Sequence, residues 1–104
     1  MNIGLFQLEN LYLTQTKFCF LDLRCAAGPT SSASIDRMLA SATRVPGSEV
    51  ESHVRQLKLA VDFPIVLLCE DGRQSAEVAQ RLEGAGHSNI YVVKRGLAGV
   101  LSEL

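Results

Sequence analysis

Residues 64–75 read Pro64-Ile65-Val66-Leu67-Leu68-Cys69-Glu70-Asp71-Gly72-Arg73-Gln74-Ser75, and this stretch decides the fold. It begins as a short, unbroken apolar run, which is typical of a strand buried on both faces in a parallel sheet. Pro64 stands at the start of the run, where a missing N–H group is tolerated. A polar loop with a glycine follows Cys69, and helical sequence begins near Ser75. The stretch therefore predicts a strand, a tight loop and a helix in direct succession.

Strand and helix patterns alternate on either side of this stretch. Further apolar runs at residues 18–23 and 90–93 predict buried strands, and residues 3–6 and 43–45 predict two short edge strands. Apolar residues at helical spacing lie between them, in segments that begin near Leu8, Ile35, Val50, Val78 and Leu97.

This alternation predicts an α/β three-layer sandwich, with a mostly parallel central sheet of about five strands flanked by helices. The helix near Val50 is expected to run to Val61 and to begin with a capping box between Ser48 and Glu51. Ligands bind beyond the carboxyl ends of the strands in such sheets. Residues 22–25 and 69–75 are therefore the segments in which to look for a site.

The chain length and composition indicate one globular domain over residues 1–104. Apolar residues make up 47% of the 104 residues and charged residues 20%, which is a globular balance. The formal net charge of −1 and the absence of Trp disfavour a nucleic-acid partner. No apolar run reaches the roughly 18 residues of a membrane span, and the start of the chain lacks a signal peptide pattern. We therefore expect a cytoplasmic protein without a membrane partner.

The loop after Cys69 is the segment with the strongest chemical signal. A compact loop between a strand and a helix turns several backbone N–H groups inward, and the helix N-terminus adds a partial positive charge. Such a nest favours the thiolate form of a cysteine at its base. Gly72 permits the left-handed turn that the loop needs. Cys69 is therefore the candidate nucleophile, although a buried strand-end cysteine with no reactivity is the alternative.

These residues resemble the active loop of the rhodanese family, which reads C-x-x-G-x-R-S. The resemblance extends from about Phe18 to Val100. The family's D-x-R motif is similar to Asp22-Leu23-Arg24, and the centre of its G-H-I-P-G-A motif is similar to residues 43–48. Further matches lie in the helix after the loop, at Ala76, Ala79, Leu82 and Gly86, and in the closing segment at residues 95–100.

The resemblance implies sulfur transfer by covalent catalysis. Cys69 would take sulfur from a small sulfur-containing anion or persulfide donor, such as thiosulfate or a polysulfide, and pass it to an acceptor such as a thiol-bearing protein. The loop amides would hold the persulfide anion. No cofactor and no metal is implied. The residues expected to bind the substrate are Glu70, Asp71, Gly72, Arg73, Gln74 and Ser75.

The loop departs from the family pattern in two ways. Gln74 stands where the family has arginine, and an arginine occurs one residue earlier, at Arg73. Glu70 and Asp71 add two negative charges, each of which opposes a dianionic donor by about 1 kcal/mol at short range in a water-like dielectric. We therefore expect weak activity with thiosulfate and better activity with a persulfide or polysulfide.

Related phosphatases carry a loop that is one residue longer, C-x5-R. Counting from Cys69, that arginine would fall at Ser75. A phosphatase without its phosphate-binding arginine is disfavoured.

Three further residues are candidate accessory groups: Arg24, Cys25 and Arg44. Arg24 is expected to pair with Asp22 at a strand end, which favours a structural role. Cys25 is a candidate resolving thiol for the persulfide. Arg44 is either a solvated loop charge or a contact for a partner. The alternative function is a non-catalytic binding or regulatory module, in which the acidic loop docks a partner and Cys69 turns over nothing.

Overall fold

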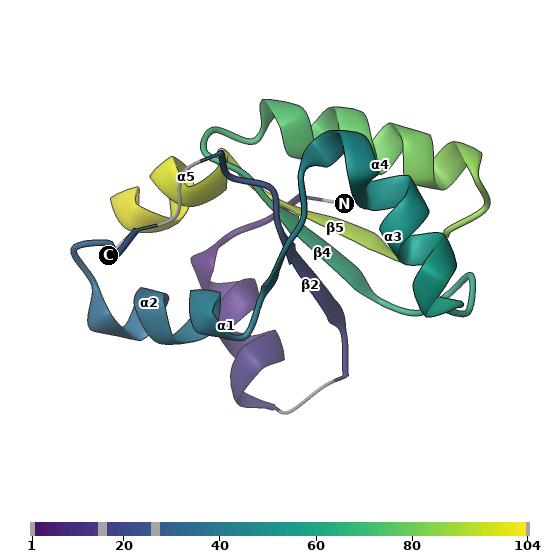
Figure 1. Cartoon of the computed structure of the whole chain (residues 1–104). Helices are drawn as coiled ribbons and strands as arrows, with labels where there is room; N and C mark the ends of the chain where they lie inside the picture. Colours follow the sequence, from purple (N-terminus) through teal and green to yellow (C-terminus); the bar gives the residue numbers. More distant parts are fainter. Residues whose placement is uncertain (1, 15–16, 26–27, 104) are drawn as a thin grey trace.

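The three most apolar runs of the chain form the centre of a parallel sheet. A computed structural model describes residues 2–14, 17–25 and 28–103. Five parallel strands pair in the order β1-β5-β4-β2-β3. Figure 1 labels the three central ones, β5, β4 and β2. Their bounds are Asn2–Ile3 for β1, Cys19–Asp22 for β2, Thr43–Arg44 for β3, Ile65–Leu68 for β4 and Ile90–Val93 for β5. The predicted α/β sandwich is confirmed.

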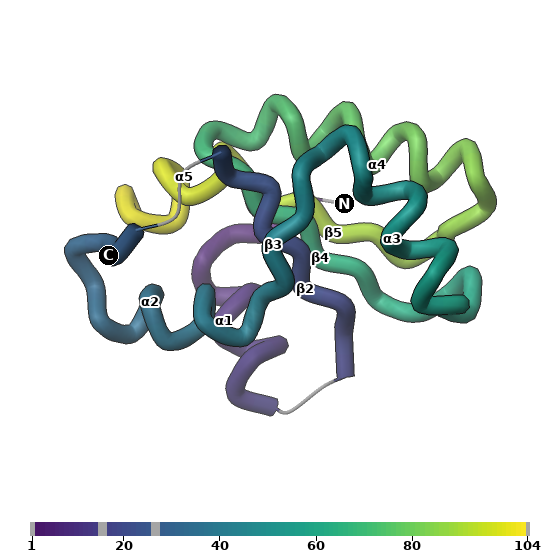
Figure 2. The backbone as a smooth tube through the Cα atoms, in the orientation of Figure 1, coloured from purple at the N-terminus to yellow at the C-terminus, as the bar shows by residue number. Residues whose placement is uncertain are grey.

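Helices cover both faces of this sheet (Figures 1 and 2). One face packs against α3 (Val50–Leu57) and α4 (Arg73–Gly84). The other packs against α1 (Leu5–Leu13), α2 (Ala33–Ala40) and α5 (Gly96–Ser102). Because successive strand residues point to opposite faces, Ile65 and Leu67 belong to the first core and Val66 and Leu68 to the second.

Strand β4 lies at the centre of both cores. Each of its four side chains is at most 1% exposed. A fully buried aliphatic side chain contributes roughly 1.5–3 kcal/mol, so this strand is held firmly in place. Leu67 pairs in register with Leu21 of β2 and with Val92 of β5. The loop that follows β4 is therefore anchored to the most deeply buried part of the molecule.

The predicted start of helix α3 is wrong. Ser48 lies in a short 3-10 helix, η1 (Gly47–Glu49), and α3 begins at Val50 without a side-chain cap. The Glu51 carboxylate, expected to complete the capping box, instead lies 2.6 Å from Nε of Arg81 on α4. An ion pair with a distant residue has replaced the local bond.

Three other element bounds differ from the prediction. Helix α3 ends at Leu57 because Lys58 adopts a left-handed conformation (φ 53°), and Val61 is consequently 60% exposed. Helix α4 begins at Arg73, two residues earlier than expected. The first strand stops at Ile3, since helix α1 begins at Leu5. Among the described residues, no helix has the length and apolar character that a membrane crossing requires.

Candidate active site

The loop after β4 brings backbone N–H groups onto the sulfur of Cys69. The Gly72 N–H donates a hydrogen bond to Cys69 Sγ at 3.1 Å, and the Ser75 N–H donates a second at 3.4 Å. Gly72 makes this possible because its φ of 92° lies in the left-handed region. Gly72 is also the N-cap of α4, which begins at Arg73, so the sulfur faces the positive end of the helix dipole. This arrangement favours a negative charge on the sulfur.

The side chain of Cys69 is nevertheless buried. The residue is 1% exposed, and Ser75 beside it is fully buried. The Ser75 hydroxyl has no hydrogen-bond partner within the part of the chain that the structure describes. A buried hydroxyl without a partner is costly, which makes it a free donor for an additional group at the site.

Helix α5 supports the loop from behind. The Leu97 N–H donates to the Cys69 carbonyl oxygen at 2.8 Å, and the Ala98 N–H donates to the Glu70 carbonyl oxygen at 3.1 Å. This close approach requires Gly96, because a Cβ at that position would overlap the Cys69 carbonyl oxygen. Sequence reasoning placed residues 95–100 in a family motif but missed their contact with the loop. Arg95 and Gly96 both have a positive φ in the structure. The only sign of this turn in the sequence is an Arg-Gly pair before a helix.

The two acidic side chains of the loop bind different groups, one outside the loop and one within it. Glu70 Oε2 accepts a hydrogen bond from the Cys25 N–H at 3.4 Å. Asp71 accepts one from the Arg73 N–H at 3.0 Å, and its second oxygen lies 3.7 Å from the Arg73 guanidinium. The Arg73 side chain is 91% exposed, so it extends into solvent. Arg73 therefore does not replace the missing family arginine over the sulfur in this conformation.

Gln74 turns toward the chain segment that precedes α3. A Cβ at Gly47 would overlap the Gln74 side-chain amide, so the two residues are in close contact. Arg81 of α4 donates a hydrogen bond to the Gly47 carbonyl oxygen at 2.9 Å and fixes the same segment. The side chain at the family arginine position thus forms part of the wall between α4 and η1.

The end of strand β2 carries a buried ion pair. Arg24 Nη2 lies 2.8 Å from Asp22 Oδ2, and the two residues are 8% and 2% exposed. The hydrogen bond that the Arg24 guanidinium donates to Asp22 is the main cause that raises the pKa of Arg24, with Glu70 and Asp36 adding a smaller effect. Arg44 donates to the Arg24 carbonyl oxygen at 2.6 Å. This geometry is that of a structural connection between β2 and β3.

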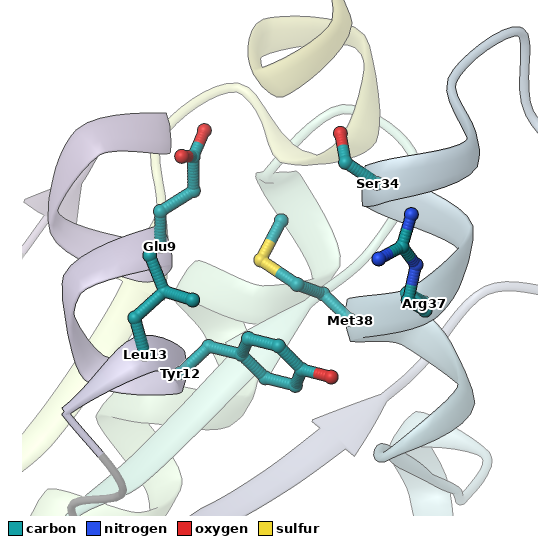
Figure 3. Close-up of a pocket in the computed structure, with 6 residues that line it drawn as sticks. All are labelled: Glu9, Tyr12, Leu13, Ser34, Arg37 and Met38. Carbon is teal, nitrogen blue, oxygen red and sulfur yellow. The ribbon is translucent and has the colours of Figure 1, made fainter.

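The structure brings the accessory candidates to one cleft beside the loop. The cleft has a volume of about 420 Å³, and Cys25, Arg44 and Gln74 are among its lining residues. Cys25 is exposed. A separate cavity of about 110 Å³ lies between α1 and α2, where Glu9 and Arg37 come from facing helices and Met38 lies between them (Figure 3). None of its lining residues belongs to the loop, so it is not part of this site.

Metal binding gains no support from the arrangement of side chains. Among residues 2–14, 17–25 and 28–103, no group of three or more His, Cys, Asp or Glu side chains is placed to hold an ion. Cys19 lies in β2, away from the loop, and burial raises the pKa of its thiol.

Several solved structures share this fold. A rhodanese homolog from Thermus thermophilus is 22% identical, with a TM-score of 0.64 over 96% of this chain and 100% of its own. A thiosulfate sulfurtransferase from Pseudomonas aeruginosa is 21% identical, with a TM-score of 0.73 over 94% of this chain and 18% of its own. An NAD-dependent persulfide reductase from A. fulgidus is 21% identical, with a TM-score of 0.63 over 93% of this chain and 15% of its own. At these identities the likeness shows the fold alone.

No curated protein matches the sequence at a significant level. The family model of the rhodanese-like domain, in contrast, matches residues 14–103. This match includes the loop, both strand ends that flank it and helix α5. The chain therefore belongs to the family of rhodanese-like domains.

Proposed function

We propose that this protein is a sulfurtransferase that carries sulfur as a persulfide on Cys69. The observation that carries the proposal is the position of the Cys69 sulfur, at a strand end, where the Gly72 and Ser75 N–H groups donate to it. These fixed donors stabilise a sulfur anion, as an oxyanion hole stabilises developing charge. The same donors serve the thiolate before transfer and the persulfide after it.

Two displacement steps complete the reaction. The Cys69 thiolate attacks the outer sulfur of the donor; a new S–S bond forms, and the donor's S–S bond breaks. With thiosulfate as donor, sulfite leaves with the bonding electron pair and Cys69 retains one extra sulfur and one negative charge. An acceptor thiolate then attacks that terminal sulfur and becomes a persulfide, while Cys69 leaves as a thiolate. Charge and atoms balance without a cofactor.

Ser75 is positioned to assist the second state of this cycle. Its hydroxyl is buried and lacks a partner among the described residues, while its N–H already contacts Cys69. The added sulfur of a persulfide extends beyond Sγ and creates a new acceptor. We assign the Ser75 hydroxyl as a donor to that sulfur.

The acidic loop favours a persulfide or polysulfide donor over thiosulfate. Glu70 and Asp71 are exposed carboxylates at the mouth of the loop, and Arg73 extends into solvent. A dianion that approaches past these groups is repelled more strongly than a monoanion. Replacing Glu70 and Asp71 with serine should raise kcat/KM for thiosulfate, and the absence of a gain contradicts this preference.

Intact mass spectrometry tests the proposal directly. After incubation with thiosulfate or inorganic polysulfide, the protein should gain the mass of one sulfur atom, which cyanide then removes. The variant Cys69→Ser should gain none, and Cys19→Ser should behave like the native protein, since Cys19 lies away from the loop. An unchanged mass with every donor contradicts the proposal.

Burial of the nucleophile favours a second candidate function. Cys69 is 1% exposed, and Gln74 occupies the position of the family arginine. A rhodanese-like domain with these features is also suited to bind a partner through the acidic loop without turnover. An unmodified mass together with partner binding that depends on Glu70 and Asp71 supports this module.

The accessory role of Cys25 remains a proposal. Its N–H contacts Glu70, next to Cys69, and the residue lines the neighbouring cleft. Attack of the Cys25 thiolate on the Cys69 sulfur of the persulfide would form a disulfide and release hydrosulfide. In the cytoplasm, where we propose that the protein resides, cellular thiol reductants would then reduce this disulfide and restore both thiols.

A further inference from the structure

The cleft beside the loop is lined by apolar residues and by two arginines. It extends from Gln74 on α4 to Cys25 after β2, and apolar side chains form much of its lining. We call it the Arg44 cleft. Its lining residues include Leu23, Cys25, Arg44, Val45, Pro46 and Gln74.

Arg44 supplies the uncompensated charge of this cleft. The lining residues include two arginines and no carboxylate. Arg24 is paired with Asp22, whereas Arg44 donates a hydrogen bond to a neutral group, the Arg24 carbonyl oxygen. No salt bridge to Arg44 occurs within the part of the chain that the structure describes. The cleft therefore presents a net positive charge to a ligand.

The Arg24 carbonyl also holds the guanidinium of Arg44 in place. One of the five N–H groups of the Arg44 guanidinium donates to this carbonyl oxygen at 2.6 Å, which leaves the other four for a ligand. Because Arg24 precedes Cys25 in the chain, this bond keeps the guanidinium near an exposed thiol of the same cleft. A held guanidinium binds a carboxylate with two parallel hydrogen bonds at a low entropic cost.

The size of the cleft indicates an organic ligand. Its volume of about 420 Å³ lies within the range of small-molecule sites. Thiosulfate would fill the space of only a few waters, each about 30 Å³ in the liquid. The side chains of Leu23, Val45 and Pro46 offer an apolar wall to methylene groups.

The charge and size together lead to one assignment, which rests on the proposed sulfur transfer. We infer that the Arg44 cleft binds the carboxylate of a small organic thiol or persulfide, and that Arg44 determines this specificity. Glu70 and Asp71 line the loop rather than the cleft, so the anion approaches from the Arg44 side. The Glu70 carboxylate, which accepts a hydrogen bond from the Cys25 N–H, lies beside the cleft.

A pair of acceptors that differ in charge tests the assignment. With sulfur-loaded protein, kcat/KM is measured for 3-mercaptopropionate and for its neutral amide. Each rate is divided by the rate of the same thiol with a small disulfide, which corrects for intrinsic nucleophilicity. We expect the native protein to prefer the carboxylate by about tenfold, since hydrogen bonds to charged groups are strong.

Variants of Arg44 separate specificity from structure. Arg44→Ala should remove the preference by raising KM for the carboxylate much more than KM for the amide. Arg44→Lys should retain part of the preference, because the charge remains. The matched control is Arg55→Ala, an exposed arginine on α3 that does not line the cleft. Equal loss of both rates in Arg44→Ala, at unchanged thermal stability, overturns the assignment.

A second measurement does not depend on turnover. Iodoacetate and iodoacetamide differ by one charge, and peptide mapping reports their reaction with Cys25. We expect the iodoacetate to iodoacetamide rate ratio at Cys25 to exceed that of free cysteine and to fall about fivefold in Arg44→Ala. The ratio at Cys19, outside the cleft, should not change.

The two experiments distinguish the possible failures. If the ratio at Cys25 falls but Cys69 gains no sulfur from any donor, the anion site stands and the proposed sulfur transfer fails. If Cys69 is loaded but neither the acceptor preference nor the alkylation ratio depends on Arg44, sulfur transfer stands and this inference fails.

Discussion

The ends of two adjacent strands, β2 and β4, hold their polar groups in different ways. After β2, the Asp22 carboxylate binds the Arg24 guanidinium and N–H, so the charges cancel within the segment. After β4, backbone N–H groups surround the Cys69 sulfur. The Ser75 hydroxyl beside them has no partner within the described ranges. The charged groups at the β2 end satisfy one another, which is typical of a structural role. The β4 end still has a hydrogen-bond donor that a ligand can use.

Removing the charge of Asp22 should give the largest loss of stability. In Asp22→Asn, the Arg24 guanidinium loses its buried counter-ion, which we expect to lower the free energy of unfolding by about 3 kcal/mol. Chemical denaturation measures the loss. The matched control is Asp62→Asn at an exposed position, with an expected change within about 0.5 kcal/mol. Equal effects of the two variants would break the contrast between the strand ends.

The β4 end should be sensitive to backbone shape instead. Gly96→Ala places a methyl group against the Cys69 carbonyl oxygen at a φ of 61°, and we expect a loss of about 2 kcal/mol. Gly84→Ala is the control, since a Cβ there meets nothing within 4 Å. Gly84→Ala should be neutral or stabilising by up to about 1 kcal/mol in a thermal melt. A neutral Gly96→Ala would show that α5 does not hold the loop.

The three thiols should react at different rates. Burial raises the pKa of Cys19, so this thiol remains protonated to a higher pH than an ordinary cysteine. We expect iodoacetamide to modify exposed Cys25 about tenfold faster than Cys19 near pH 8, and the gap should narrow as the pH rises. Peptide mapping over time gives both rates. A Cys19 that reacts as fast as Cys25 contradicts the burial of its side chain.

The smallest effect is expected at the wall of the Arg44 cleft. Arg81→Ala removes an ion pair with Glu51 and a hydrogen bond to the Gly47 carbonyl oxygen. Both partners of the ion pair are nearly half exposed, so the loss should be about 1 kcal/mol. A denaturation midpoint measures it against Arg55→Ala, which should change little. A larger loss would indicate that this wall supports the fold as much as the strand ends do.

Sequence reasoning located the strands, the helices and the Cys69 loop because their signals are local. The apolar run at residues 64–69 and the glycine at position 72 are sufficient to predict a strand and a tight loop. It failed at the start of α3, where Glu51 found a partner 30 residues away instead of its neighbour Ser48. A capping motif in the sequence identifies only the local hydrogen-bond partners of a side chain, and not the distant partners that the fold brings close to it.

The site was predicted in part. The sequence placed Cys69, Arg24 and Cys25 at the carboxyl ends of strands, and the structure brings Arg24 and Cys25 to one cleft with Arg44 and Gln74. It offered no sign that Gln74 would lie against Gly47 or that Arg73 would extend into solvent. Side-chain direction depends on the rotamers and neighbours of each residue, which spacing alone does not specify.

The sequence by itself determined the order of elements, the strand that directly precedes Cys69 and the glycine that turns its loop. Those features follow from hydrophobic period and backbone freedom, which act over a few residues. Tertiary structure alone decided that Gly96 closes against the loop, that the Cys69 sulfur is buried, and that Arg44 is held by the Arg24 carbonyl. Each of these results depends on segments that are far apart in the chain and meet only once the sheet has assembled.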